Sequence, residues 1–328
     1  MSALPQPQPD HELTEILEHY ELGQVLRFWP AAHGIENQNF FVETQQGDRV
    51  VGYVLTIIMN PSTAGDAYVP LMQHLDRLGL PVAPPLNNRA GEPITWVDGR
   101  ACLLQIKING RHTVNPTLRQ VESLGHFMAR LHLATDASAC QLPAYSRQQT
   151  WLLEQAAFVS PHLPWADRSL LATCLTQTTS LLARTDVAGL PQGIIHGDLF
   201  RDNVLFNEHG LTGALDFHHA AQGYFIYDLA VAANDWCCDA SGRLDSDRTT
   251  RLLRAYHTLR PLTDTELWFF SMFAAYGALV FWLSRAVTEQ KRRDGEEARN
   301  KDPEEFKRIL THLQKHSFYL NPLALDLR

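Results

Sequence analysis

Apolar and polar residues follow two different patterns along the chain, and the change falls near residue 108. Before it, runs rich in β-branched and aromatic residues predict strands at 25–29, 39–44, 49–58 and 101–108. Apolar residues at helical spacing predict a helix through 13–20 and another over 68–78. We therefore expect residues 1–107 to form a small N-terminal lobe built on an antiparallel sheet.

The rest of the chain, residues 108–328, mostly has the apolar spacing of helices. A first helix is expected to begin at Asn115-Pro116 and to end near His132. Further helices are predicted at 150–159, 168–184, 227–237, 244–256, 264–285 and 303–316, with the charged residues 291–301 as an exposed connection. Strands are predicted at 194–195, 204–206 and 211–215, the last two joined by a turn at 207–210. These patterns predict the α+β class, with a larger and mainly helical C-terminal lobe.

Composition and charge exclude several kinds of protein. The chain has 328 residues, of which 45% are hydrophobic, and this is enough for two domains with cores of their own. The net charge is −8 and no stripe of Lys or Arg is present, so we expect no nucleic-acid partner. The five cysteines lack paired C-x-x-C spacing, so neither a zinc site nor a disulfide framework is expected.

Two segments bear on secretion and on membranes. Residues 1–10 are rich in Pro and Gln and lack the basic start and apolar core of a signal peptide, so a disordered lead-in is expected. Residues 267–283 form an uncharged run that is shorter than the roughly 20 residues of a membrane span. We expect a buried core helix there, and a cytoplasmic protein with no membrane partner. The sequence does not set the oligomeric state.

The most informative stretch is 194–217, which places polar side chains between the predicted strands. His196, Asp198 and Asn203 fall in a loop, and Asp216 ends the second strand of the hairpin. Phosphoryl transfer from a nucleotide needs a carboxylate that orients the acceptor hydroxyl and takes its proton, and oxygen ligands for Mg²⁺. Asp198 has the placement for the first role, and Asn203 and Asp216 have it for the second. His196 is expected to support the loop.

The spacing His-x-Asp-x-x-x-x-Asn, followed by an Asp one hairpin later, is typical of kinase catalytic loops. Asp and Asn in a loop are more often only turn formers, yet their offsets on a strand, loop and hairpin favour catalysis. Gly197 stands where protein kinases have Arg, and His218 follows Asp216-Phe217 where they have Gly. That Arg couples the loop to activation-loop phosphate, so its absence favours a small-molecule acceptor.

These residues resemble those of the aminoglycoside-phosphotransferase-like kinases, and most closely the homoserine kinases of the protein-kinase-like type. The matching segments are 34–37, 196–206, 216–217, 227–230, 234–237 and 301–306, which together span almost the full chain. The resemblance implies a bilobal protein-kinase-like fold with ATP between the lobes, and ATP and Mg²⁺ as cofactors. It also implies L-homoserine as the small-molecule acceptor and O-phospho-L-homoserine as the product, on the route to threonine.

Gly34, Asn37 and Asn39 lie in a loop between two predicted strands and at its end. Glycine in such a loop lets backbone N–H groups approach phosphate oxygens closely, as kinases do when they cover a nucleotide. An ordinary hairpin turn is the alternative for this stretch. The resemblance of its Gly-Ile-Glu-Asn sequence favours phosphate contact, so we predict that the three residues bind the nucleotide.

The run 105–110 is the expected hinge between the lobes, and we assign Gln105 and Lys107 to the nucleotide. The strand residues 54–58 include no Lys to pair with the α- and β-phosphates, which is a departure from most kinases. Arg201, three residues after the predicted catalytic carboxylate, is one candidate for neutralising the phosphates. A solvated surface charge is the alternative for this side chain.

Asp228 and Asp235 are seven residues apart in the predicted helix 227–237, so they share one face of it. Both are placed in the predicted substrate region. The resemblance implies that Asp228 braces the catalytic loop through backbone N–H groups. Asp235 either receives the ammonium group of an amino-acid acceptor or is a solvated helix charge. His132 is expected to be a hydrogen-bonded structural residue more than a ligand or base.

Two other functions are consistent with the sequence. The first is the same chemistry on an aminoglycoside, a choline-like compound or another small alcohol, because fold and phosphate machinery do not choose the acceptor. The second is a weakly active nucleotide-binding scaffold, which is suggested by the absence of a lysine from strand residues 54–58. The presence of Asp198, Asn203 and Asp216 together argues against the scaffold.

Overall fold

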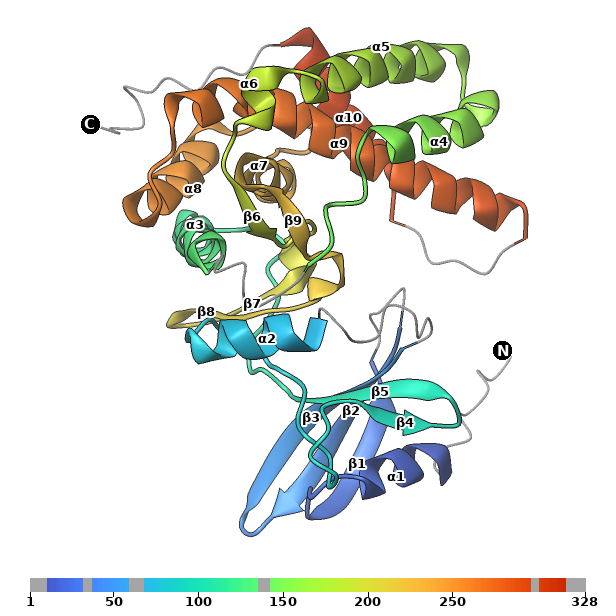
Figure 1. The fold of residues 1–328 in the computed structure, drawn as a ribbon, viewed down its shortest axis with the longest axis vertical. Helices are drawn as coiled ribbons and strands as arrows, with labels where there is room; N and C mark the ends of the chain where they lie inside the picture. Colours follow the sequence, from blue (N-terminus) through green and yellow to red (C-terminus); the bar gives the residue numbers. More distant parts are fainter. Residues whose placement is uncertain (1–10, 32–36, 59–67, 135–141, 296–300, 317–328) are drawn as a thin grey trace. The chain divides into compact units, whose positions relative to one another are not determined.

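The structure is a computed structural model that describes residues 11–31, 37–58, 68–134, 142–295 and 301–316 (Figure 1). The chain divides into two compact units. Unit 1 comprises residues 1–76 and 83–108, and unit 2 comprises residues 77–82 and 109–328. Unit 1 contains a sheet and unit 2 contains most of the helices, so the predicted α+β class is confirmed.

Unit 1 is built on a five-stranded antiparallel sheet with two helices. Its elements are α1 (His11–Glu18), β1 (Gln24–Pro30), β2 (Gln38–Gln46), β3 (Arg49–Ile58), α2 (Tyr68–Arg77), β4 (Thr95–Val97) and β5 (Arg100–Ile106). The strands lie in the order β1-β2-β3-β5-β4, and each pair of neighbours is antiparallel. All the strands and helices predicted in this part of the chain are present, and β4 has no counterpart in the prediction.

Alternation of side chains along the strands gives this sheet two different faces. One face packs against α1, where Leu55 of β3 and Leu104 of β5 are fully buried together with Ile16 of the helix. On the opposite face, α2 contacts the end of β3 through Val69 and Ile58. The middle of that second face is only half-buried, and it carries polar residues that bear on nucleotide binding.

Unit 2 is mainly helical and is organised around the long helix α9 (Asp264–Arg293). Its other helices are α3 (Leu118–Leu133), α4 (Gln149–Val159), α5 (Trp165–Leu182), α6 (Thr185–Ala188), α7 (Phe225–Trp236), α8 (Ser246–Leu259) and α10 (Pro303–Lys315). Helices α4, α5, α7 and α10 pack on α9 (Figure 1). Helices α3 and α8 approach closely at Gly125, where a Cβ atom would lie 2.5 Å from the carbonyl oxygen of Leu252.

Helix α9 is the described helix that is long and apolar enough to cross a membrane, and 72% of its apolar window is buried inside the protein. Phe270 and Phe273 are fully buried in this window. The uncharged run 267–283 therefore forms a core helix, as predicted. The predicted end of the helix at 285 is wrong, because regular hydrogen bonding continues to Arg293 through a basic last turn that suits a helix C-terminus.

Helix α3 begins later than Asn115-Pro116 predicts. Thr117 is its N-cap, and the side-chain oxygen of Thr117 accepts the backbone N–H of Gln120 at 3.3 Å. The side chain of Gln120 in turn accepts the backbone N–H of Thr117 at 2.9 Å. This capping box satisfies two N–H groups at the helix start, which explains why the helix begins after Thr117.

Two small sheets in unit 2 hold the predicted catalytic loop. β6 (Gln192–Ile195) pairs with β9 (Ala221–Tyr224), and β7 (Val204–Asn207) forms a hairpin with β8 (Gly210–Ala214). The hairpin is confirmed. Strand β9 has no counterpart in the prediction, because its sequence Ala-Gln-Gly-Tyr contains no β-branched residue. The β6–β9 pairing brings the start of the loop beside the chain that follows the hairpin.

Candidate active site

The catalytic loop, residues 196–203, connects the buried strand β6 to β7. Gly197 has φ +77°, a backbone conformation that residues with side chains rarely adopt. An added Cβ atom would lie 3.1 Å from the carbonyl oxygen of His219. The arginine that protein kinases have here would therefore strain this backbone, which explains the glycine at this position.

A buried carboxylate holds the start of this loop. Asp228 lies in the first turn of α7 with no exposed surface, and its oxygens accept the backbone N–H groups of His196 (3.0 Å) and Gly197 (2.7 Å). Its Oδ2 also lies 3.0 Å from Nε2 of His132 on α3. Burial acts to raise the pKa of Asp228, but the bonds from His132 and the loop hold this pKa below its ordinary value. The carboxylate therefore stays charged and joins α3, α7 and the loop.

Two buried imidazoles complete this network. Nδ1 of His132 lies 2.7 Å from the hydroxyl of Tyr256, as expected for a structural histidine. Nε2 of His196 lies 2.9 Å from the carbonyl oxygen of Leu215, and Nδ1 of His196 accepts the N–H of Asp198 at 3.3 Å. A carbonyl oxygen can only accept, so the proton of His196 is on Nε2. Burial lowers the pKa of both imidazoles, and both are neutral at pH 7.

Asp198 follows in the loop, half-buried, with a buried Oδ1 that has no hydrogen-bond partner among the described residues. Burial raises the pKa of Asp198 to about 7, and the charge of Asp216 acts in the same direction. His219, Lys301 and Arg147 act to lower this pKa. A carboxyl group of this kind, with a free lone pair and a pKa near neutrality, is suited to take a proton from an acceptor hydroxyl.

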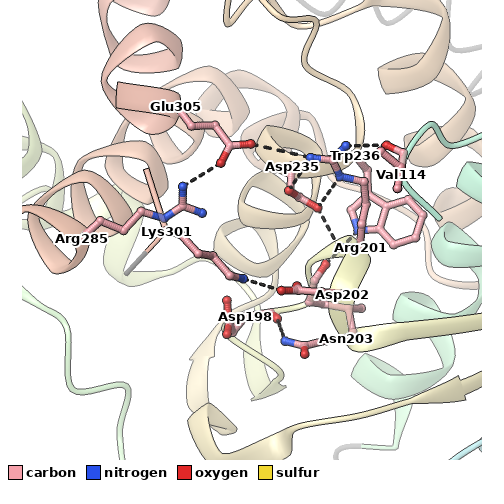
Figure 2. Close-up of polar contacts among 11 residues, drawn as sticks. Val114, Asp198, Arg201, Asp202, Asn203, Asp235, Trp236, Arg285, Lys301 and Glu305 are labelled. Atoms are coloured by element: carbon pink, nitrogen blue, oxygen red, sulfur yellow. Dashed lines mark hydrogen bonds and ion pairs between the residues drawn. The ribbon is translucent and has the colours of Figure 1, made fainter. Parts of the chain in front are cut away.

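Asn203 and Asp216 supply oxygen atoms near Asp198. The side-chain nitrogen of Asn203 donates to the carbonyl oxygen of Asp198 at 2.8 Å, which fixes the amide and leaves its oxygen as an acceptor (Figure 2). Asp216 is exposed and has φ +59°, which is rare for a residue other than glycine. Backbone strain of this kind is concentrated at functional sites.

The oxygen ligands near Asp198 suit Mg²⁺ that is also bound by phosphates and water, more than a metal ion held by protein side chains alone. In the part of the chain that the structure describes, no group of three His, Cys, Asp or Glu side chains is placed to hold a metal ion. Asn203 and Asp216 offer two oxygens, beside the unpartnered Oδ1 of Asp198. Mg²⁺ is commonly bound by one or two such oxygens, with substrate phosphates and water as its other ligands.

Arg201 and Asp235 form an ion pair that joins the loop to α7 (Figure 2). Oδ2 of Asp235 accepts the backbone N–H of Arg201 at 2.7 Å and its Nε at 3.0 Å, and Oδ1 accepts Nη2 at 3.1 Å. Nη1 of Arg201 donates to the carbonyl oxygen of Val114 at 2.7 Å. Each side chain is therefore satisfied by protein partners, and direct contact of either with phosphate or substrate stays a prediction.

Residues near the end of the described chain reach the same loop, although we did not predict them as site residues. Nζ of Lys301 lies 2.5 Å from Oδ2 of Asp202, and Oε1 of Glu305 lies 3.6 Å from Nη2 of Arg201 (Figure 2). Oε2 of Glu305 lies 2.6 Å from Nη1 of Arg285 on α9. The signal that pointed to Lys301 and Glu305 is their place in the resembling segment 301–306.

The predicted nucleotide residues belong to unit 1. Asn37 lies in the bend before β2, and Gly34 lies outside the described residues. Asn39 pairs with Thr56 of β3, and Gln105 pairs with Val54, two residues earlier on the same strand. Paired residues of neighbouring strands share a face, so Asn39 and Gln105 lie on the same face of the sheet, opposite the face that packs on α1.

Lys107 shares that face, because it follows Gln105 by two residues and its Nζ lies 5.6 Å from the ring centroid of Phe41. The side chains of Asn39 and Gln105 have hydrogen-bond partners within unit 1. Oδ1 of Asn39 accepts the hydroxyl of Thr56 at 2.7 Å, and the amide nitrogen of Gln105 donates to the carbonyl oxygen of Ala83. The sheet thus brings three of the five predicted nucleotide residues together on one face.

Comparison with known proteins identifies the family. Residues 28–262, more than half of the chain, match the model of the phosphotransferase enzyme family. The chain belongs to this family. The homoserine kinase of Pseudomonas aeruginosa (strain UCBPP-PA14) is 36% identical to this phosphotransferase over 314 residues, which cover 95% of this chain and 96% of that protein. The predicted resemblance is confirmed, and this phosphotransferase is an enzyme that acts on a hydroxyl group.

Solved structures show the same fold. Amicoumacin kinase, in complex with AMP-PNP, Ca²⁺ and amicoumacin, has a TM-score of 0.65 at 18% identity, with 93% of this chain and 92% of that chain covered. Spectinomycin phosphotransferase, in complex with ADP and spectinomycin, has a TM-score of 0.66 at 13% identity, with 98% of each chain covered. The predicted protein-kinase-like fold class is therefore confirmed for this phosphotransferase.

Asp198→Asn is expected to lower the turnover number of the phosphotransferase about 100- to 10,000-fold, because an amide cannot take the acceptor proton. The shift in melting temperature on adding Mg·ATP is expected to remain, because other residues are assigned to the nucleotide. The matched control is Glu208→Gln, which alters an exposed carboxylate in the turn between β7 and β8. Near-parent turnover in Asp198→Asn would contradict the assignment of Asp198.

The imidazoles of His132 and His196 are expected to gain a proton at lower pH than an ordinary histidine. Both are buried, and burial disfavours the charged form and lowers each pKa below the ordinary value of about 6.5. The measurement is the ring ¹⁵N chemical shift of the two imidazoles by NMR as the pH is lowered from 7.5. Protonation of His132 or His196 at the ordinary histidine pKa of about 6.5 would show that the network around Asp228 is not closed to water.

Proposed function

We propose that this phosphotransferase transfers the γ-phosphoryl group of ATP to the hydroxyl of L-homoserine, giving O-phospho-L-homoserine for threonine biosynthesis. The similarity to the Pseudomonas homoserine kinase over nearly the full length of both proteins supports the choice of acceptor. The observation that carries the proposed chemistry is the buried Oδ1 of Asp198, which has no partner among the described residues. An acceptor hydroxyl that donates to this oxygen would satisfy it and be oriented by it.

In this mechanism, Asp198 orients the hydroxyl of homoserine and accepts its proton while the hydroxyl oxygen bonds to the γ-phosphorus. The bond from the γ-phosphorus to the bridging oxygen breaks, and ADP leaves with that oxygen. With a pKa raised to about 7, Asp198 can be charged before the transfer and can hold the proton after it. His196 and Asp228 do not need to touch the acceptor. Their bonds to the loop backbone set the position of Asp198.

Mg²⁺ is assigned to the side-chain oxygens of Asn203 and Asp216. When bound, Mg²⁺ neutralises charge on the phosphates and holds them in line for transfer. The nucleotide is assigned to Gly34, Asn37, Asn39, Gln105 and Lys107 of unit 1. For Arg201 and Asp235 we propose positioning roles, because their bonds to each other hold the loop against α7 and leave no oxygen of Asp235 unpaired.

The other candidate functions have weaker support. Amicoumacin kinase and spectinomycin phosphotransferase share the fold at 18% and 13% identity, so their acceptors do not favour an antibiotic substrate here. A scaffold without turnover has no need of a buried, unpartnered carboxylate oxygen beside two possible metal ligands. We place the enzyme in the cytoplasm, consistent with its buried α9 and with a biosynthetic reaction.

Among small hydroxyl compounds, L-homoserine is expected to give the highest ATP-dependent kcat/KM, with choline, kanamycin and L-serine at least about tenfold lower. The physical reason is that a site shaped for one acceptor loses hydrogen bonds with the others. Turnover is measured by ADP release, and the product is identified as a phosphate monoester by ³¹P NMR. Asp198→Asn serves as the blank for ATP hydrolysis that does not depend on the site.

A higher kcat/KM with choline or an aminoglycoside than with L-homoserine would mean that the acceptor is assigned wrongly, although the protein is still a kinase. Binding of Mg·ATP without turnover on any acceptor would favour the scaffold. Either result would overturn the proposed function, and the ³¹P spectrum separates the first from hydrolysis by water.

A further inference from the structure

One cation near the catalytic loop, Arg147, has no carboxylate partner among the residues that the structure describes. The side chain of Arg147 is half-buried in unit 2, and its guanidinium lies over the rings of Trp151 (5.7 Å to the centroid) and Phe281 (5.5 Å). Within the described residues, this guanidinium makes no hydrogen bond or ion pair. The other described arginines of unit 2 that lie over aromatic rings, Arg184, Arg260 and Arg285, each pair with a carboxylate.

The backbone around Arg147 is held firmly. The carbonyl oxygen of Arg147 accepts the hydroxyl of Tyr276 on α9 at 2.6 Å. Two residues earlier, the N–H of Tyr145 donates to the carbonyl oxygen of Gln222 on β9 at 2.8 Å. The backbone at Arg147 is therefore anchored to α9 and β9, and its guanidinium lies over two aromatic rings.

Arg147 is also close to the catalytic loop. The ring of Phe281, over which the guanidinium lies, has its centroid 4.6 Å from that of Phe200, two residues after Asp198. The ring of Tyr145 approaches Gly197, where an added Cβ atom would lie 3.4 Å from it. The charge of Arg147 acts on the carboxyl group of Asp198, in agreement with this geometry.

We propose that Arg147 binds the carboxylate of the amino-acid acceptor whose hydroxyl Asp198 receives. The inference rests on the proposed function, since homoserine carries a carboxylate a few bonds from its hydroxyl. The guanidinium of Arg147 lies over two rings and has no hydrogen-bond acceptor among the described residues, and the N–H edge of an arginine matches a carboxylate with two parallel hydrogen bonds. Lys301 is less suited to this role, because its Nζ already bonds Asp202 at 2.5 Å.

The test uses Arg147→Met, which retains apolar contact with Trp151 and Phe281 but removes the charge. Two acceptors are compared: L-homoserine, and 3-aminopropan-1-ol, which has the same hydroxyl and ammonium groups without the carboxylate. The KM for L-homoserine is expected to rise about 10- to 100-fold, the loss typical of a hydrogen-bonded charge, with kcat within about threefold. The KM for ATP and kcat/KM for 3-aminopropan-1-ol are expected to stay within about threefold of the parent.

The matched control is Arg184→Met, because Arg184 also lies over an aromatic ring, that of Phe269 at 5.3 Å, but pairs with Asp186. It should keep the parent's KM for L-homoserine. Arg147→Lys keeps a charge without the paired N–H edge and should give an intermediate KM. The lysine variant also keeps the test valid if the methionine variant folds poorly.

The outcomes separate this inference from the proposed function. No turnover of L-homoserine by the parent protein would overturn both. Turnover by the parent with an unchanged KM for L-homoserine in Arg147→Met and Arg147→Lys would overturn the role of Arg147 alone. An equal loss of kcat with both acceptors would also overturn it, because such a loss would mean that Arg147 acts on the phosphoryl group or on the loop.

Discussion

The buried carboxylate of Asp228 is the interaction on which the geometry of the active site depends. A charge enclosed in protein must be met by hydrogen bonds or by an opposite charge, and Asp228 is met by two backbone N–H groups of the catalytic loop and by His132. Movement of the loop would leave this charge unsatisfied. The loop is therefore held in place because its two N–H groups, together with His132 of α3, satisfy the buried charge of Asp228.

A single helix holds both ends of the catalytic loop. Asp228 and Asp235 lie seven residues apart on α7, so both face the loop. Asp228 binds the backbone at His196 and Gly197, and Asp235 binds the backbone and side chain of Arg201. Between these anchors lies Asp198, whose orientation follows from the backbone on either side. In the proposed mechanism, one acidic face of α7 therefore positions the loop and need not contact the substrate.

Local sequence patterns predicted the features that are determined by residues close together in the sequence. The hairpin, the helix α7 and the offsets of Asp198, Asn203 and Asp216 all follow from spacing and turn chemistry. The partner of Asp235 was beyond such reasoning, because Arg201 lies 34 residues away and only tertiary packing pairs the two. Arg147 belongs to no motif, and its guanidinium lies over rings contributed by α4 and α9, which only the tertiary fold brings together.

Hydrogen exchange at the loop amides tests the central claim most directly. In Asp228→Asn, one amide N–H₂ group must face a donor, so the amides of His196 and Gly197 are expected to exchange about tenfold faster or more, the loss typical of a hydrogen bond to a charged group. Asp247→Asn, which alters an exposed aspartate in the first turn of α8, should leave their exchange unchanged. Equal protection of the two amides in Asp228→Asn and in the parent would contradict the account.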